Sequence, residues 1–462
     1  MNERAPGATM SIEQELASFV THTRADDVPQ QAQHVVRNIL RTVIGTAIAG
    51  AHEDGVSAAQ KVYGTPAQTQ SARVLVHGTR VTAASAATIN GLMARSLDFC
   101  DAMAPGLHIG SSLVPAALAA AEMAGGCSGQ EFLAALSVGA ELASRMNLTE
   151  QGYAGLDPTG VAGVFASTAA ASRVLGLDAT QTRHALALAF NRCGGSFQSN
   201  IDGTLAVRMI QGWVAGDGIT CAQLAQAGLT GPGNFISGVY GYARLYAKTP
   251  DFEIAVGQGL GTDYQLLGTM FKKYPSCGMT QGATELALRL QQAQHIDPAN
   301  VGHIEVRVPA YGFKLVGHDF ILGENPRVNA QFSLQYCVAN ALVREASTLD
   351  HFRPERIGDP DVMTLAGRVS VIHDPALDAR EHTSVALQVT MTNGAAWRDA
   401  LDIAPGFPGQ ALTDVEHTER FAACLSYAAC SDATRRALLE RIDSIDLCDD
   451  VRELVDLTLS DH

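Results

Sequence analysis

Residues Ser112–Ala124 read Ser-Leu-Val-Pro-Ala-Ala-Leu-Ala-Ala-Ala-Glu-Met-Ala, and this alanine-rich stretch sets the character of the N-terminal half of the chain. Alanine has the highest helix propensity and a small side chain, so the stretch predicts a helix that packs closely against its neighbours. Segments with apolar residues three or four positions apart recur on both sides of it. We predict helices over Ala32–Ala47, Ala83–Leu97, Ser112–Ala124, Gly129–Arg145, Thr159–Leu175 and Asp178–Phe190.

The pattern changes after Gly261, where alternating apolar residues predict strands at His303–Val308, Val369–His373 and Val385–Met391. The pair Asn393-Gly394 favours a hairpin turn. Helical periodicity returns in the tail from residue 413 onward. We predict a mainly α protein in which a large all-helical domain covers residues 11–261 and is completed by residues 404–462. A smaller α+β domain with an antiparallel sheet covers residues 262–403.

Composition excludes several classes of protein. The chain carries 32 basic and 47 acidic residues, and no basic block accompanies aromatic residues, so we expect no nucleic-acid partner. No stretch approaches the ~18 apolar residues of a membrane span, and Met1–Met10 lacks the apolar core of a signal peptide. The nine cysteines are scattered without a CxxC pair, which is typical of reduced thiols. We expect a cytoplasmic protein that contacts no membrane and binds no metal.

The first segment that could carry chemistry joins two nearly uncharged helices over residues 97–112. It contains Asp98, Asp101, His108 and Ser111, and the helix that follows offers free N–H groups to a substrate carboxylate. On its own, such a segment is more often a plain connection, with the two aspartates at turns and the histidine hydrogen-bonded within its loop. The choice between a functional site and a plain connection therefore depends on the other candidate segments of the chain.

Two further segments contain polar residues at the start of apolar helices. In the segment Tyr153–Gly160, Asp157 or Thr159 is best interpreted as a helix N-cap. Arg208 lies within an apolar helix, where an unpaired charge is costly to bury. We therefore expect Arg208 to face an anion, either a protein carboxylate or a ligand.

The fourth segment, Phe271–Gln281, lies at the predicted domain junction and includes Lys272 and Lys273. Adjacent lysines usually mark a solvated turn. A cationic segment between two domains is also, however, where ligand pockets tend to form.

Taken together, these four segments resemble the MmgE/PrpD superfamily, which includes 2-methylcitrate dehydratase, cis-aconitate decarboxylase and iminodisuccinate epimerase. The resemblance spans nearly the whole chain and extends to residues 228–232, 330–336 and 405–408. It implies a large helical domain, a smaller α+β domain, a homodimer, no metal or organic cofactor, and a small anionic carboxylate as substrate.

The sequence departs from the superfamily pattern inside these motifs. Asp98, Asp101 and His108 match the first motif, and Lys272 and Cys277 match the fourth. Relatives carry Thr, His or Lys at five positions that differ in this chain, namely Ala102, Asp157, Val207, Ile210 and Gln281.

The resemblance implies a cofactor-independent lyase that removes a proton beside a carboxylate of a di- or tricarboxylate. Dehydration needs both a base and an acid, and the departures remove several donors. An epimerase or isomerase of a dicarboxylate needs fewer groups, namely two bases and a cation that stabilises the enediolate. A catalytically silent paralogue is the third alternative.

We expect His108 to move the proton, with Asp98 or Asp101 orienting its ring and raising its pKa. Lys272 acts beside these residues as a catalytic cation, and Tyr153 and Asp157 are the alternative bases. The expected substrate-binding set is Arg208, Ser111, Tyr153, Asp157, Lys273, Cys277 and Gln281.

Overall fold

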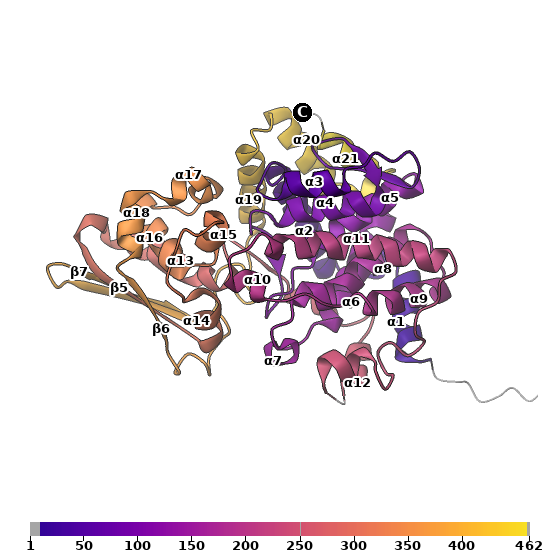
Figure 1. Ribbon diagram of the computed structural model, residues 1–462, viewed down its shortest axis with the longest axis horizontal. Coiled ribbons are helices and arrows are strands. Elements are labelled where there is room, and N and C mark those ends of the chain that lie inside the picture. The colour runs from indigo at the N-terminus through magenta and orange to yellow at the C-terminus, as the bar shows by residue number, and fades with distance from the viewer. Residues whose placement is uncertain (1–9, 250, 460–462) are drawn as a thin grey trace, which may run out of the picture.

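The computed structural model describes residues 10–249 and 251–459, so most of the Met1–Met10 segment and the last three residues of the tail lie outside the described residues. Two bodies lie side by side, a larger helical one and a smaller one built on a sheet (Figure 1). This division confirms the predicted mainly α fold. The exact limits at residues 261 and 404 stay a prediction.

The helical domain forms where the apolar periodicity predicts it, and all six predicted helices are confirmed within a few residues at either end. Thr159–Leu175 begins as a π turn over Thr159–Gly163 and continues as a regular helix. The helices of this domain are α1 (Ile12–His22), α2 (Gln30–Ala49), α3 (Val56–Tyr63), α4 (Ala83–Arg95), α5 (Gly110–Ala124), α6 (Gly129–Met146), α7 (Glu150–Tyr153), α8 (Val164–Val174), α9 (Ala179–Phe190), α10 (Gln198–Ile201), α11 (Ala206–Gln226) and α12 (Phe252–Gly257).

The smaller domain is built on a four-stranded sheet of order β6-β5-β7-β8. Its strands are β5 (Val301–Val308), β6 (Val369–His373), β7 (Val385–Met391) and β8 (Ala396–Leu401). The sheet is mixed, because β6 runs parallel to β5 while the other pairs are antiparallel. The prediction of an antiparallel sheet is wrong for this one pair. A parallel neighbour requires a crossover, which the helices between β5 and β6 supply.

Helices cover one face of this sheet, where α13 packs on β7 and β8 and α16 packs on β6. The hairpin predicted at Asn393-Gly394 connects β7 to β8, and Gly394 has the positive φ that such a turn needs. The helices of this domain are α13 (Gln281–Gln294), α14 (Ala310–Val316), α15 (Pro326–Gln331), α16 (Leu334–Arg344), α17 (Pro354–Ile357) and α18 (Pro360–Ala366).

The C-terminal tail returns to the helical domain as α19 (Asp414–Tyr427), α20 (Asp432–Asp443) and α21 (Arg452–Leu457), drawn in yellow in Figure 1. Its apolar residues Phe421, Leu438 and Leu454 share one hydrophobic core with the N-terminal helices. The fit is close at Gly129, where an added Cβ would lie 1.5 Å from the carbonyl oxygen of Ile445.

The helical domain also contains three short strands, which corrects the expectation of an all-helical domain. β1 (Ser71–Arg73) and β2 (Arg80–Thr82) form a small hairpin. β3 (Asp101–Ala102) pairs with β4 (Met270–Phe271), so that Asp101 lies opposite Phe271. Segments of two or three residues are too short to show a period of two in the sequence.

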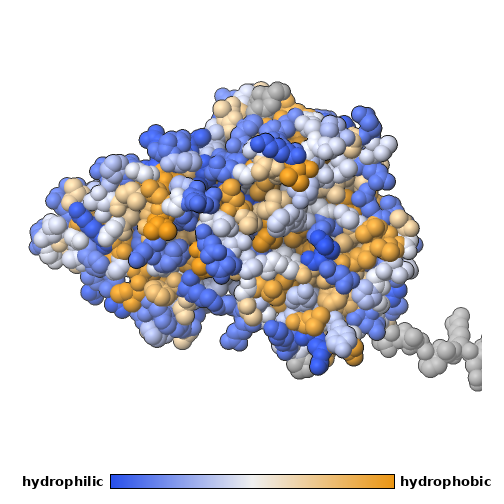
Figure 2. Space-filling model, viewed as in Figure 1, coloured by the Kyte–Doolittle hydropathy of each residue, from blue (hydrophilic) through white to orange (hydrophobic). Residues whose placement is uncertain are grey.

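Among the described residues, no helix has the length and hydropathy needed to span a bilayer. Large apolar side chains are nevertheless exposed, and apolar patches interrupt the polar surface, the broadest of them over the helical domain (Figure 2). The large exposed apolar residues of this domain include Val62, Ile201, Trp213, Leu224, Leu229, Val239, Tyr240, Leu245, Ile254, Val415 and Leu447.

We propose that this domain buries part of that apolar surface in a homodimer, because large exposed apolar patches mark association surfaces. Sedimentation velocity at micromolar concentration should give the mass of two chains. A single-chain mass over the whole micromolar range would contradict the proposal.

Candidate active site

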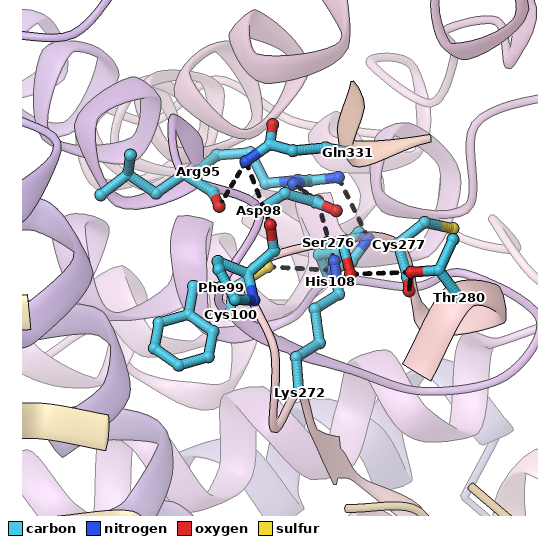
Figure 3. Close-up of polar contacts among 12 residues, drawn as sticks. Arg95, Asp98, Phe99, Cys100, His108, Lys272, Ser276, Cys277, Thr280 and Gln331 are labelled. Atoms are coloured by element: carbon cyan, nitrogen blue, oxygen red, sulfur yellow. Dashed lines mark hydrogen bonds and ion pairs between the residues drawn. The ribbon is translucent and has the colours of Figure 1, made fainter. Parts of the chain in front are cut away.

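A pocket lies where the two domains meet, and its polar lining comes from both of them. The polar side chains are those of Arg95, His108, Asn200, Lys272 and His382, and apolar side chains surround them. Figure 3 shows Arg95, Asp98, His108 and Lys272 pointing toward one another. An apolar pocket with a few convergent polar groups is the usual form of a small-molecule site.

The pairing of β3 with β4 brings the first and fourth sequence segments together. Asp98 precedes β3, His108 follows it, and Lys272 follows β4 directly. A third loop supports β4, because the backbone N–H of Phe271 donates to the carbonyl of Gly406 at 3.0 Å. Gly406 has a φ of +86°, and a Cβ there would lie 1.9 Å from the Phe271 carbonyl oxygen, so only glycine fits.

Three buried charges form the core of the site. One oxygen of Asp98 accepts from the Arg95 guanidinium and lies 2.8 Å from the Lys272 ammonium. All three residues are at most 2% exposed. Burial, with the positive charge of Arg95, lowers the pKa of Lys272 to about 8. With one carboxylate between two cations, the cluster carries one positive charge in excess.

His108 is held as a neutral base. Its Nδ1 lies 2.8 Å from the backbone carbonyl oxygen of Asp101 and its Nε2 lies 3.4 Å from the Arg95 guanidinium. A carbonyl only accepts hydrogen bonds, so Nδ1 carries the proton and Nε2 the lone pair. Burial, and then the charges of Arg95 and Lys272, hold the pKa of His108 well below its usual value.

This geometry corrects two expectations about His108. The ring is oriented by a backbone carbonyl and by the backbone N–H of His108, which donates to the Thr159 hydroxyl at 3.0 Å, and no carboxylate takes part. The pKa is lowered first by burial, and then because the carboxylate of Asp98 is already paired with two cations and leaves their field uncompensated at the imidazole.

Asp101 and Ser111 lie at the N-terminus of α5, and neither of them lines the pocket. The Asp101 carboxylate accepts from the backbone N–H of Gly110 at 2.9 Å, so it already occupies the N-terminus of α5. Burial raises its pKa. Ser111 is fully buried behind that end and does not line the pocket. The expected carboxylate site at this helix end is therefore wrong, because the protein's own aspartate fills it.

Asp157 and Tyr153 also lie outside the pocket between the domains. Asp157 accepts from the backbone N–H groups of Thr159 at 2.8 Å and Gly160 at 3.0 Å, which makes it a cap, as the sequence favoured. Burial raises its pKa to about 6. The Tyr153 hydroxyl donates to Asn147 at 2.6 Å, and burial raises its pKa. Neither residue is placed to replace His108.

Of the three remaining candidate residues in the fourth segment, one lines the pocket. Lys273 points away from the pocket, with its ammonium 3.1 Å from Glu285. Cys277 lines the pocket, and burial raises the pKa of its thiol. Gln281 supports the loop, since its side chain accepts from the backbone N–H of Tyr274 at 2.9 Å and donates to the Tyr274 carbonyl at 3.0 Å.

Arg208 is buried beside Arg95 without lining the pocket. Helices α4 and α11 pack closely through Gly91 and Gly212, which brings their two arginines near each other. Neither terminal nitrogen of Arg208 has a hydrogen-bond partner among the described residues. Burial, opposed by the charge of Asp54 and assisted by that of Arg95, lowers the pKa of Arg208 to about 10. In the described part of the chain, no side chain in contact with Arg208 supplies the anion that the sequence predicts for it.

One group of side chains has the spacing of a metal site. Ligand atoms of Asp98, Cys100 and His108 lie within 4.8 Å of one another. The same carboxylate oxygen is paired with Arg95 and Lys272, whose charges oppose a bound cation. The expectation that the chain needs no metal stays a prediction.

Sequence reasoning missed Arg95, Asn200 and His382. Arg95 could have been found, because it is a lone charge in an apolar helix, the same signal that marked Arg208. Asn200 belongs to the four-residue helix α10 and His382 to a loop before β7, where no pattern points to a site.

The two arginines predict opposite effects on stability. Arg95→Met should lower the thermal unfolding midpoint, because it removes one partner of a buried carboxylate, a loss of about 1–3 kcal/mol. Arg208→Met should leave the midpoint unchanged or raise it, because it removes a buried cation without a partner. Differential scanning calorimetry of both variants checks this, and equal losses would show that Arg208 has a partner of its own.

Comparison with known proteins identifies the family of the chain. The family model described as the MmgE/PrpD N-terminal domain matches residues 14–255, and the MmgE/PrpD C-terminal domain matches residues 274–444. The cis-aconitate decarboxylase-like protein oryM of Aspergillus oryzae is 26% identical over 97% of this chain and 97% of its own. Cis-aconitate decarboxylase of mouse is 25% identical over 79% of this chain and 76% of its own. The human protein is 26% identical over 80% and 78%, respectively. Because the two models together cover most of its length, this chain belongs to the MmgE/PrpD family.

Proposed function

We propose that the chain is a cofactor-independent lyase that acts on a small di- or tricarboxylate by removing a proton beside a carboxylate. The observation that carries this proposal is a neutral imidazole next to two buried cations at the domain junction. Its Nε2 lone pair accepts one long hydrogen bond, of 3.4 Å, from Arg95, which a substrate carboxylate bound to Arg95 would replace. The nine free cysteines favour a reducing compartment, and we propose the cytoplasm.

The cations account for substrate binding. Arg95 and Lys272 leave one positive charge in excess, while the whole chain has a formal net charge of −15. An anionic substrate is therefore attracted by a local field that opposes the field of the molecule. Removing the proton turns a bound carboxylate into a dianionic enediolate, which the two cations stabilise more strongly than the substrate.

The proton transfers can be assigned to two side chains. Nε2 of His108 takes the proton, and the electron pair of the C–H bond moves into the carboxylate. When the enediolate collapses, the β-hydroxyl leaves with a proton from the Lys272 ammonium, which gives water and a carbon–carbon double bond. A lysine with a pKa of about 8 is protonated at neutral pH and is a stronger acid than an ordinary lysine.

The alternative is an epimerase or isomerase, in which Lys272 returns the proton to the same carbon from the other side. Decarboxylation, the activity in the names of the mouse and human relatives, needs a proton donor after loss of CO₂ and no base. The low pKa of His108 favours a reaction that begins with a base. A catalytically silent paralogue would have no reason to keep this costly buried cluster.

Substitution of the two groups should separate their roles. His108→Ala should lower kcat by ~10²–10⁴, the usual contribution of a positioned acid–base group. Lys272→Ala should raise KM and lower kcat together, because it removes binding and the acid. The assay incubates each protein in deuterated water with a panel of di- and tricarboxylates and follows deuterium uptake, alkene formation and CO₂ release by NMR.

Lys273→Ala is the matched control, since this neighbouring lysine faces Glu285 and should leave turnover unchanged. Full activity of His108→Ala on the substrate found would remove the assigned base. No uptake or turnover with any acid of the panel would contradict the proposed function itself.

The pKa shifts predict a displaced pH profile. The alkaline limb of kcat/KM should lie near pH 8, because Lys272 acts as the cation and is lost as the pH rises through its lowered pKa. The acid limb should lie well below the usual range of an imidazole, because His108 acts as the neutral base and its pKa is lowered. Lys272→Arg keeps the cation but cannot give up a proton, so alkene formation should fall while deuterium uptake continues with its alkaline limb moved upward. An alkaline limb that stays near pH 8 in this variant would assign it to another group.

A further inference from the structure

One polar group in the wall of the pocket is not used by the proposed mechanism. Asn200 lies in α10, which Figure 1 shows at the boundary between the two domains. The residue lines the same pocket as Arg95, His108 and Lys272 and is only 6% exposed. Its side-chain oxygen has no hydrogen-bond partner among the described residues.

A buried amide oxygen without a partner is costly, so a site that holds one is prepared for a donor. A carboxylate cannot be this partner, because it only accepts. An ammonium group is disfavoured by the positive charge of Arg95 and Lys272 in the same pocket. The donor that suits both the amide oxygen and the cationic surroundings is a neutral hydroxyl.

We propose that Asn200 is a specificity-determining residue that accepts a hydrogen bond from a hydroxyl of the substrate, so that the enzyme selects hydroxylated polycarboxylates over their deoxy analogues. The inference rests on the proposed function, and it deepens that function by choosing among its substrates. A hydroxyl that donates to Asn200 keeps its oxygen lone pairs free to take a proton, as the leaving group of a dehydration must.

The test compares pairs of acids that differ only in one hydroxyl, namely citrate with tricarballylate and malate with succinate. Dissociation constants are measured by calorimetry in the His108→Ala background, which blocks turnover. The unsubstituted Asn200 protein should bind the hydroxylated acid of at least one pair about tenfold more tightly, which corresponds to one buried hydrogen bond. Asn200→Leu should reduce that preference to about one.

The variant Asn200→Asp tests whether the substrate group that contacts Asn200 is a hydroxyl or a carboxylate. The new carboxylate still accepts from a hydroxyl, so the preference should persist even where repulsion weakens both acids of a pair. Gln198→Leu is the control, because Gln198 lies on the same short helix but is exposed and bonded to Asp202. Circular dichroism and the unfolding midpoint establish that each variant is folded.

Three results would overturn the inference: no preference for a hydroxyl with Asn200 present, a preference that survives in Asn200→Leu, or no binding of either hydroxylated acid. The proposed function is judged separately by the deuterium and turnover assay. Binding with a hydroxyl preference but without any turnover in the parent chain would contradict that function and leave the inference intact.

Discussion

The carboxylate of Asp98, held between Arg95 and Lys272, is the interaction on which the site depends. Arg95 ends a helix of the large domain and Lys272 follows the strand at the domain junction, so one buried anion joins two parts of the chain that are far apart in sequence. Neither cation would be stable at this depth without it. The β3–β4 pairing and the close fit of Gly406 against Phe271 hold the backbone that makes this contact possible.

The fold was largely predictable because its helices are local and strongly periodic. The alternation in β5, β6 and β7 also revealed three strands of the main sheet. The sequence could not show that β6 runs parallel to β5, since strand direction depends on the path of a crossover and not on alternation. The two-residue strand β3 could not be predicted either, because it is too short to show any period.

The site was predictable in part, and the errors share one cause. Asp98, His108 and Lys272 were identified, and the structure brings them together. Residue type does not show whether a polar side chain meets a ligand or the protein's own backbone. Asp101 fills the helix end that was expected to bind substrate, and Gln281 supports a loop. At Asp157 and Gln281, where relatives are expected to carry histidine, this chain has groups that accept backbone hydrogen bonds.

In the proposed mechanism, the charges that bind the substrate also control the base. In the empty pocket, burial and the fields of Arg95 and Lys272 keep His108 neutral, which leaves a lone pair on Nε2 but weakens it as a base. Carboxylates bound to these two cations would offset their field at the imidazole, and the affinity of Nε2 for a proton would rise with the substrate in place. The same two side chains would then stabilise the enediolate that the stronger base creates. Binding and basicity would thereby be coupled through electrostatics, and this coupling would allow His108 to serve as the base where relatives are expected to carry further histidines.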